Sequence, residues 1–333
     1  MTRATVFGSG SWGTAYAAIL ADAGCDVTIW SRRPEVADEI NSTRRNGGYL
    51  PDLQLPDAVR ATADPREAAE GAQVAVLAVP SQTLRDNLAQ WGDAIGDDAY
   101  VVSLMKGIEL GTTRRMSEVI AEAASVDPER IVVVSGPNLA REIAAKQPAA
   151  AVVASTNAMA RARVAEASAT PYFRPYTNGD VVGVEIGGAV KNVIALAVGM
   201  AKGMGMGDNT MASLLTRGLA ETARFGIRLG ADPQTFLGLA GVGDLVATCA
   251  SPLSRNYTFG FKLGQGQTLE EVQASTKQTA EGVKSCRSIL ELATSVGAEV
   301  PIVENVAAVV FEGRRPADVV EQLMSRSRKH ERS

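Results

Sequence analysis

The chain has 333 residues, of which 46% are hydrophobic and 21% are charged, so it has the length of about two domains and too much apolar content for wholesale disorder. Its net charge of −4 provides no broad basic surface, which argues against nucleic acid or an anionic membrane as a partner. The only histidine, His330, lies in a polar C-terminal segment, so a multi-histidine metal site is excluded and no bound metal is expected.

The three cysteines, Cys25, Cys249 and Cys286, are far apart and form no C-x-x-C pair. This spacing argues against a disulfide framework and predicts a reducing, cytoplasmic location. A catalytic role for Cys249 is an alternative, but a small buried thiol is the better expectation. We expect no signal peptide, and no membrane span either, because Lys191 interrupts the apolar run from 184 to 200.

The first half of the chain alternates short runs rich in valine and isoleucine with amphipathic segments. Strands are predicted at 4–7, 26–30, 59–62, 72–80, 100–107, 130–137, 149–155 and 172–177. The intervening helices are predicted at 14–24, 34–44, 81–91, 112–124, 138–145 and 157–169, with a short one starting at Pro65. Ser81 is the expected cap of the helix at 81–91. This alternation predicts a Rossmann-type α/β domain over residues 1–180, with a doubly wound parallel sheet covered on both faces.

After residue 180 the pattern becomes helical, with no convincing strand. Helices are predicted at 181–202, 209–229, 254–264, 280–296, 301–312 and 315–325. The sequence therefore predicts an all-α second domain over residues 181–325, joined to the first near 178–190. The last residues, 326–333, are expected to be a disordered tail.

A glycine motif, G-x-G-x-x-G, joins the first predicted strand to the first predicted helix at Gly8, Gly10 and Gly13. In this context it indicates a dinucleotide site, since the glycines allow a tight turn, a close approach to pyrophosphate and close packing of helix on strand. A plain β–α turn is the alternative. Where NAD enzymes carry a ribose-binding carboxylate, this chain has Arg32 and Arg33. They favour NADP(H), with NAD(H) also possible, unless they are only solvated surface arginines.

Candidate substrate-binding residues follow two predicted strands and open one helix. Lys106 follows one strand, and Gly136, Asn138 and Ala140 follow the next, where they would line a nicotinamide pocket. Asp244 lies among glycines and apolar residues, where a carboxylate needs a partner. At the start of a later helix, a capping serine and its two neighbours offer a phosphate site: Ser254, Arg255 and Asn256. A solvated Lys106 and an ordinary capped helix are the plainer alternatives.

Lys191 is the charged residue in the long apolar run, and an unpaired buried lysine is costly. Its ammonium group either extends along the helix to the surface or points into the cleft between the domains. The apolar neighbours and the unpartnered Asp244 favour the second arrangement, with Lys191 near Asp244 and Lys106. If a bound nicotinamide cofactor reduces a substrate here, a proton donor is needed. The single histidine is in the C-terminal segment, so a lysine is the natural donor.

A series of blocks resembles bacterial NAD(P)+-dependent glycerol-3-phosphate dehydrogenases from residue 4 to about 312. The blocks are GSGSWGTA, VPSQ, KGIE, SGPNLARE, GAVKNVIALAVGMAKG, GDNTMASLLTRGLAE, GVGDLVATCASPLSRN and AEGV. The resemblance implies a Rossmann domain joined to a helical domain, and interconversion of dihydroxyacetone phosphate and sn-glycerol 3-phosphate for phospholipid synthesis. It also implies a homodimer. Two departures, Tyr257 and Thr279, leave local cofactor contacts open.

The same resemblance assigns roles by position. Lys191 would be the general acid/base, assisted by Lys106 and Asp244, and substrate would also meet Gly136, Asn138, Ala140, Ser254, Arg255 and Asn256. The residues expected to contact the cofactor are Gly8, Gly10, Ser11, Trp12, Gly13, Arg32, Arg33, Tyr49, Lys106, Ala140, Arg255, Thr279 and Glu281. Two other functions remain as alternatives: another two-domain dehydrogenase, acting on sugar phosphates or β-hydroxyacids, and a non-catalytic dinucleotide sensor. A sensor has no need of Lys106, Lys191 and Asp244.

Overall fold

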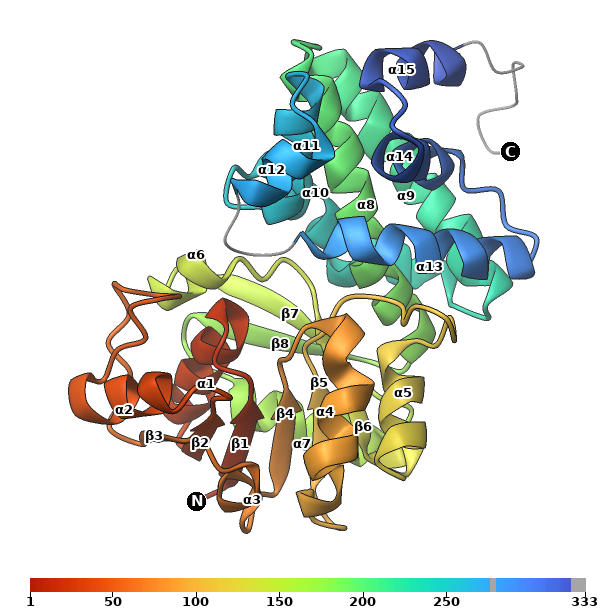
Figure 1. Ribbon diagram of the computed structural model, residues 1–333. Helices are drawn as coiled ribbons and strands as arrows, with labels where there is room; N and C mark the ends of the chain where they lie inside the picture. The colour runs from red at the N-terminus through yellow and green to blue at the C-terminus, as the bar shows by residue number, and fades with distance from the viewer. Residues whose placement is uncertain (276–279, 325–333) are drawn as a thin grey trace.

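A computed structural model describes residues 1–275 and 280–324, and it contains a sheet region followed by a helical region, as predicted (Figure 1). Eight strands form one sheet in the order β3-β2-β1-β4-β5-β6-β7-β8. The strands are β1 (Arg3–Phe7), β2 (Asp26–Trp30), β3 (Val59–Thr62), β4 (Val74–Leu77), β5 (Tyr100–Ser103), β6 (Ile131–Ser135), β7 (Ala149–Ala154) and β8 (Phe173–Asn178). Strands β4 and β6 are buried throughout, as expected of the interior of a parallel sheet.

The prediction of a parallel sheet is wrong at one position, because β7 runs antiparallel to β6. The connection between them contains only the five-residue helix α6 (Ala140–Ala144). A parallel crossover needs a longer connection that returns along the face of the sheet. Here the chain stays at the carboxyl end of β6 and runs back as β7. Strand β8 then pairs parallel with β7 at the edge, where Pro175 is tolerated.

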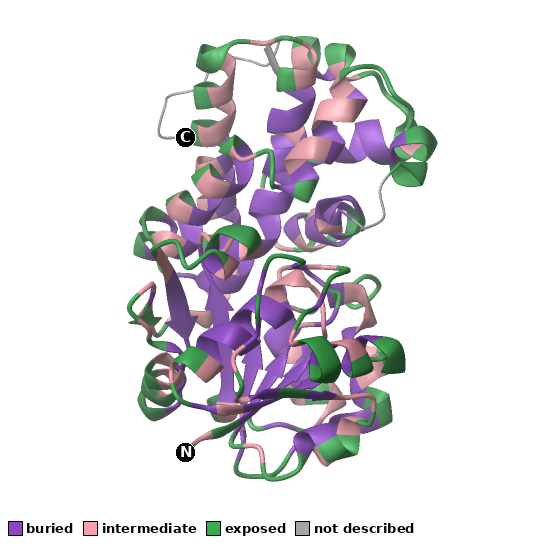
Figure 2. Cartoon of the chain, turned by 90° about the vertical axis from the view of Figure 1, so that its left-hand side faces the viewer, coloured by how far each residue is buried: buried purple, intermediate pink, exposed green. Residues whose placement is uncertain are grey.

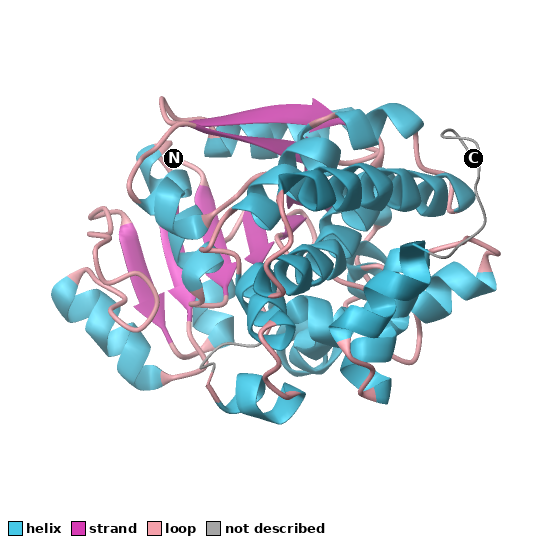
Figure 3. Ribbon diagram, turned by 90° about the horizontal axis from the view of Figure 1, so that it is seen from above, coloured by secondary structure: helices cyan, strands magenta, loops and turns pink. Residues whose placement is uncertain are grey.

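Helices cover both faces of the sheet, as predicted (Figure 3). One face packs against α1 (Ser11–Asp22), α2 (Pro34–Thr43), α6 and α7 (Ala158–Ser168). The other packs against α3 (Pro65–Ala69), α4 (Leu84–Trp91) and α5 (Met116–Ala123). Two predicted helix starts are wrong. Residues Ser81–Thr83 form a 3₁₀ turn in which Ser81 caps no helix, and α5 begins only at Met116, because residues 108–115 form a loop.

The helical region is built around α8 (Val181–Gly203), which runs through its middle to the sheet region (Figure 1). All six predicted helices are present: α8, α9 (Asp208–Arg228), α11 (Arg255–Gly264), α13 (Glu281–Ser295), α14 (Pro301–Glu312) and α15 (Pro316–Met324). The prediction missed a 3₁₀ turn at Pro233–Leu237, a π-helical turn at Leu239–Gly243, α10 (Asp244–Ala250) and α12 (Leu269–Ala274). The described residues after Asn178 contain no strand.

Helix α8 is long and apolar enough to cross a membrane, but 83% of its most apolar stretch is buried inside the protein. It is a core helix, as Figure 2 shows by the buried residues along it. Gly199 on α8 and Gly260 on α11 let the two helices approach closely, since a Cβ atom at either would overlap a backbone carbonyl of the other helix. This contact brings the start of α11 beside the part of α8 that carries Lys191.

Candidate active site

The glycine loop between β1 and α1 has the geometry of a dinucleotide site. Gly8 has φ +128° and a Cβ atom there would lie 2.5 Å from the carbonyl oxygen of Ala78, so only glycine fits. A Cβ at Gly13 would overlap the carbonyl of Gly8, whereas a Cβ at Gly10 would meet nothing within 4 Å. The space at Gly10, beside the N-terminus of α1, is open to a pyrophosphate, as the dinucleotide fingerprint requires.

Several predicted cofactor residues lie together near this loop. The Arg33 guanidinium lies 5.7 Å from the ring centroid of Tyr49, and Ser11 Oγ donates to the Tyr49 carbonyl at 3.5 Å. At the end of β2, Ser31 takes the place of a ribose-binding carboxylate and accepts a hydrogen bond from Ser9 Oγ at 2.9 Å. Arg32 and Arg33 are both exposed there. The indole of Trp12 packs edge-on against Tyr16, and Thr279 lies outside the described residues.

Two lysines from different regions share one buried carboxylate. Lys191 Nζ, from α8, contacts Asp244 Oδ1 and donates to Thr248 Oγ1 at 2.6 Å. Lys106 Nζ, which follows β5, lies 2.7 Å from Asp244 Oδ2 and donates to the Gly136 carbonyl at 3.0 Å. The Asp244 side chain is 1% exposed and that of Lys191 is 9% exposed. The prediction that Lys191 lies near Asp244 and Lys106 is confirmed. The alternative, in which its ammonium group extends along the helix to the surface, is wrong.

Small residues on α8 make this meeting possible. A Cβ atom at Gly188 would lie 2.9 Å from Ser135 Oγ and 3.4 Å from Lys106 Cγ. A Cβ at the preceding residue, Gly187, would overlap the carbonyl of Ala240. The two glycines therefore let α8 touch both the end of β6 and the turn before α10, so that Lys191 and Asp244 meet at the carboxyl ends of the strands. A ligand site is expected at that edge of an open α/β sheet.

Burial and the neighbouring charges set the protonation state of Lys191. Burial lowers the pKa of Lys191, Asp244 raises it and Lys106 lowers it, and together they bring it from 10.5 to about 8. The amine of Lys191 can therefore gain or lose a proton near neutral pH. Burial raises the pKa of the neighbouring Cys249 thiol to about 12, so this residue is a buried filler rather than a nucleophile.

The start of α11 forms the other side of the site. Ser254 Oγ accepts from the Tyr257 backbone N–H at 3.3 Å, which confirms the predicted cap, and Arg255 is exposed beside it. The Asn256 amide is occupied differently from the prediction: its nitrogen donates to Asn192 Oδ1 at 3.0 Å, and its oxygen accepts from the Gly282 N–H at 3.0 Å. Asn256 thus ties α11 to α8 and α13, with one amide hydrogen left for a ligand.

Asn138 and Glu281 are two further residues predicted to contact ligands. Neither amide atom of Asn138 has a hydrogen-bond partner among residues 1–275 and 280–324, although both atoms are buried. Buried amides are normally paired, so the Asn138 amide has unused hydrogen-bonding capacity. Burial raises the pKa of Glu281, and the charges of Arg255, Lys106 and Lys191 oppose this, which places the carboxylate among the site cations.

Sequence reasoning missed Thr248 and Asn192. Thr248 lies four residues after Asp244 on α10, so both side chains lie on one face, and it holds the Lys191 ammonium. That spacing would have been visible had the helix been recognised. Asn192 follows Lys191 and would have been found as the second polar residue of the apolar run.

Comparisons with known proteins agree with this geometry. The sequence model of the NAD-dependent glycerol-3-phosphate dehydrogenase N-terminus matches residues 3–161, and that of the C-terminus matches residues 180–321. Glycerol-3-phosphate dehydrogenase [NAD(P)+] from Streptomyces avermitilis is 63% identical over 330 residues, covering 99% of this chain and 98% of that protein. The protein of the same name from Thermobifida fusca is 60% identical over 333 residues, covering 100% of this chain and 99% of that one.

A solved structure extends the comparison to three dimensions. The crystal structure of glycerol-3-phosphate dehydrogenase from Coxiella burnetii superposes with a TM-score of 0.93 at 35% identity, covering 98% of this chain and 99% of that one. The sheet, the helical region and their order along the chain are therefore shared. The chain belongs to the NAD-dependent glycerol-3-phosphate dehydrogenase family.

Proposed function

We propose that this chain is an NAD(P)H-dependent glycerol-3-phosphate dehydrogenase that reversibly reduces dihydroxyacetone phosphate to sn-glycerol 3-phosphate, and that it supplies glycerophospholipid synthesis in the cytoplasm. The observation that carries this proposal is the pair of lysines held by one buried carboxylate, at the same carboxyl edge of the sheet as the glycine loop. Residues 1–180 bind the dinucleotide, and residues 181–325 complete the substrate site.

Lys191 performs the proton transfer. When bound, the nicotinamide supplies a hydride from its C4 atom to the C2 carbonyl of the substrate. Negative charge then grows on the carbonyl oxygen, and the Lys191 ammonium stabilises it and donates a proton to it. In the reverse direction the neutral Lys191 amine accepts the hydroxyl proton. Asp244 orients both ammonium groups, and Lys106 adds a second positive charge on the side of the sheet.

The remaining site residues bind and orient the substrate and the cofactor. Asn138, with the backbone around Gly136 and Ala140, holds the substrate near the end of β6. Ser254, Arg255 and Asn256 bind the phosphate with the free N–H groups of α11. The cofactor lies along Gly8, Gly10, Ser11, Trp12, Gly13, Arg32, Arg33, Tyr49, Lys106, Ala140, Arg255, Thr279 and Glu281.

The enzyme is proposed to act as a homodimer. The helical region carries exposed apolar side chains, including Ile227 on α9, Leu237 in the 3₁₀ turn before α10, and Val246 on α10. Such side chains offer surface that a second copy can bury. Light scattering of the purified protein gives the mass directly, and a monomer over the working concentration range would contradict this assignment.

A substrate panel tests the function. The purified protein is mixed with NADPH and either dihydroxyacetone phosphate, a sugar phosphate or a β-ketoacid, and the loss of nicotinamide absorbance is followed. We expect turnover with dihydroxyacetone phosphate. Turnover only with another substrate would favour a different dehydrogenase, and NADPH binding without any turnover would favour a dinucleotide sensor.

The first prediction concerns cofactor choice. Replacing Arg32 and Arg33 by alanine removes two guanidinium groups that can bind the 2′-phosphate of NADPH. Each charged hydrogen bond contributes about 1.5–3 kcal/mol, so the KM for NADPH should rise about tenfold or more, with little change for NADH. Steady-state kinetics with both cofactors measures this. Arg60→Ala, an exposed arginine on β3, is the matched control, and equal effects on both cofactors would remove Arg32 and Arg33 from phosphate recognition.

The second prediction concerns the substrate phosphate. Arg255→Ala should raise the KM for dihydroxyacetone phosphate about 10- to 100-fold, because one charged hydrogen bond is lost. Unphosphorylated dihydroxyacetone, already a poor substrate, should change little. Lys262→Ala, at the other end of α11, is the control. If both substrates lose the same factor in Arg255→Ala, this arginine does not bind the phosphate.

A further inference from the structure

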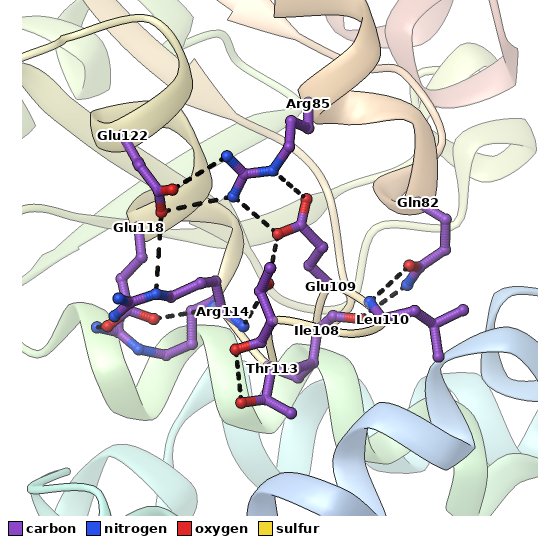
Figure 4. A network of polar contacts seen from close by, with 11 residues as sticks. Gln82, Arg85, Ile108, Glu109, Leu110, Thr113, Arg114, Glu118 and Glu122 are labelled. Atoms are coloured by element: carbon purple, nitrogen blue, oxygen red, sulfur yellow. Dashed lines mark hydrogen bonds and ion pairs between the residues drawn. The ribbon is translucent and has the colours of Figure 1, made fainter.

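The loop of residues 108–115, here called the junction loop, begins two residues after Lys106 and leads to α5. It is closed on itself by an isolated antiparallel bridge between Ile108 and Arg115 and by a hydrogen bond from the Glu109 N–H to the Arg114 carbonyl at 2.9 Å. Figure 4 shows the polar side chains that surround it. The loop has no assigned part in the reaction, although it fixes the chain two residues after a lysine of the site.

One glutamine holds the backbone at the start of the loop (Figure 4). Gln82 Nε2 donates to the Ile108 carbonyl at 2.7 Å, and Gln82 Oε1 accepts from the Leu110 N–H at 2.9 Å. Gln82 lies in the turn that follows β4. A single rigid amide therefore fixes two peptide groups on either side of Glu109.

A bidentate ion pair with Arg85 holds the side chain of Glu109. Arg85 on α4 donates from Nε to Glu109 Oε1 at 3.0 Å and from Nη2 to Oε2 at 2.9 Å, and its Nη1 reaches Glu122 on α5 at 3.2 Å. Burial opposes ionisation of Glu109, but hydrogen bonds from Arg85 and Thr112 lower the pKa of its carboxyl group. The pair is thus ionic, and its fork geometry resists rotation.

The helical region also contacts the chain just after Lys106, at Gly107 and Ile108. The Ile108 side chain is fully buried in the apolar core around α8, and Ser288 Oγ on α13 donates to the Ile108 carbonyl at 2.8 Å. Gly107 lies between two serines, since a Cβ atom there would be 2.7 Å from Ser81 Oγ and 3.0 Å from Ser285 Oγ. The backbone after Lys106 is therefore fixed by contacts from both regions.

We propose that Gln82 and Glu109, acting with Arg85, are positioning residues that hold the backbone after Lys106 so that its ammonium group reaches Asp244 from the sheet side. The assignment rests on the proposed function of the site. Lysine has a long flexible side chain, and its reach to a carboxylate depends on where its backbone is fixed. A displacement of about 1 Å in a catalytic arrangement can cost up to 100-fold in rate.

The competing explanation is that this network only stabilises the fold. The two explanations differ in their effect on Lys191. The charged groups that act on its amine are Asp244 from α10, Lys106 from the loop after β5 and, more remotely, Glu281 from α13. If the Lys106 ammonium moves away, the pKa of Lys191 rises, because a like charge is removed and Asp244 becomes free to bind it alone. A loss of fold stability alone has no such effect.

The test is an NMR titration of the lysine side chains in the full-length protein without substrate. Lys106→Met serves as the reference and should raise the pKa of Lys191. Gln82→Leu and Glu109→Gln should raise it in the same direction by a smaller amount, and they should lower kcat for dihydroxyacetone phosphate about tenfold. Asp93→Asn, which breaks an exposed bidentate pair with Arg66 away from the site, is the control and should change neither quantity.

A lower melting temperature in Gln82→Leu and Glu109→Gln, with the pKa of Lys191 unchanged, would overturn the proposal. If Glu109→Gln does not fold, Glu109→Asp keeps the charge but shortens the reach, and it should give the same direction of shift. The titration needs no turnover. A wild-type protein that is inactive with dihydroxyacetone phosphate would therefore defeat the proposed function, while the titration would still decide the role of Gln82 and Glu109.

Discussion

Replacing Lys191 by methionine should lower turnover by about 10²–10⁴-fold, the usual contribution of a general acid. Methionine keeps the length and the apolar packing of the buried stem on α8, but it removes both the charge and the proton. The fold should persist, because no ammonium is left unpaired and Asp244 retains Lys106 at 2.7 Å. NADPH binding should persist as well, since the glycine loop and the arginines after β2 are untouched.

Steady-state kinetics, circular dichroism and fluorescence titration with NADPH measure these three quantities. Lys202→Met is the matched control, because this lysine lies in the last turn of the same helix and is 44% exposed. It should behave like the wild type. A folded Lys191→Met protein with near-normal turnover would show that another group transfers the proton.

The wild-type rate should depend on pH through the same amine. With a pKa of about 8, Lys191 is protonated below that value and neutral above it. Reduction of the ketone needs the protonated form, so kcat for reduction should fall as the pH rises through about 8. Oxidation of glycerol 3-phosphate needs the neutral form and should rise over the same range. Profiles in both directions check this sign, and parallel profiles would contradict the acid/base assignment.

Most of the fold could be predicted from hydrophobic periodicity, and the exceptions have physical causes. Strands such as Val74–Leu77 are continuous apolar runs, and a helix such as Asp208–Arg228 has a clear apolar stripe. An apolar run looks the same in sequence whether its strand is parallel or antiparallel. The reversed direction of β7 follows instead from the short connection through α6. Helix α10 was missed because glycines precede it and it is only seven residues long.

The centre of the site could be predicted because buried charges require partners. Lys191 and Asp244 each stood in an apolar setting, and each needed the other. The use of the Asn256 amide could not be foreseen, because its partners, Asn192 and Gly282, lie on two other helices. The same limit applies to the junction loop, since the contacts of Glu109 depend on how α4 packs beside it.

Replacing Asp244 by asparagine should disable reduction while leaving the shape of the site almost unchanged. Asp244 is the carboxylate that both ammonium groups contact, and it raises the pKa of Lys191. Without it, burial and Lys106 lower that pKa below about 8, so a smaller fraction of the amine is protonated at neutral pH. Loss of one partner of a buried ion pair also costs about 3–5 kcal/mol in the free energy of unfolding.

We therefore expect Asp244→Asn to move the alkaline fall of the reduction profile to lower pH, and to lower kcat for reduction at neutral pH by about 10²-fold or more. Oxidation needs the neutral amine and should lose less. Urea unfolding measures the stability loss, and Asp208→Asn, at a fully exposed carboxylate 3.9 Å from Lys202, is the control. A profile that keeps its alkaline fall near pH 8 in Asp244→Asn would mean that Lys191 is not the titrating group, because the buried Lys191 amine cannot lose this counter-charge and keep its pKa.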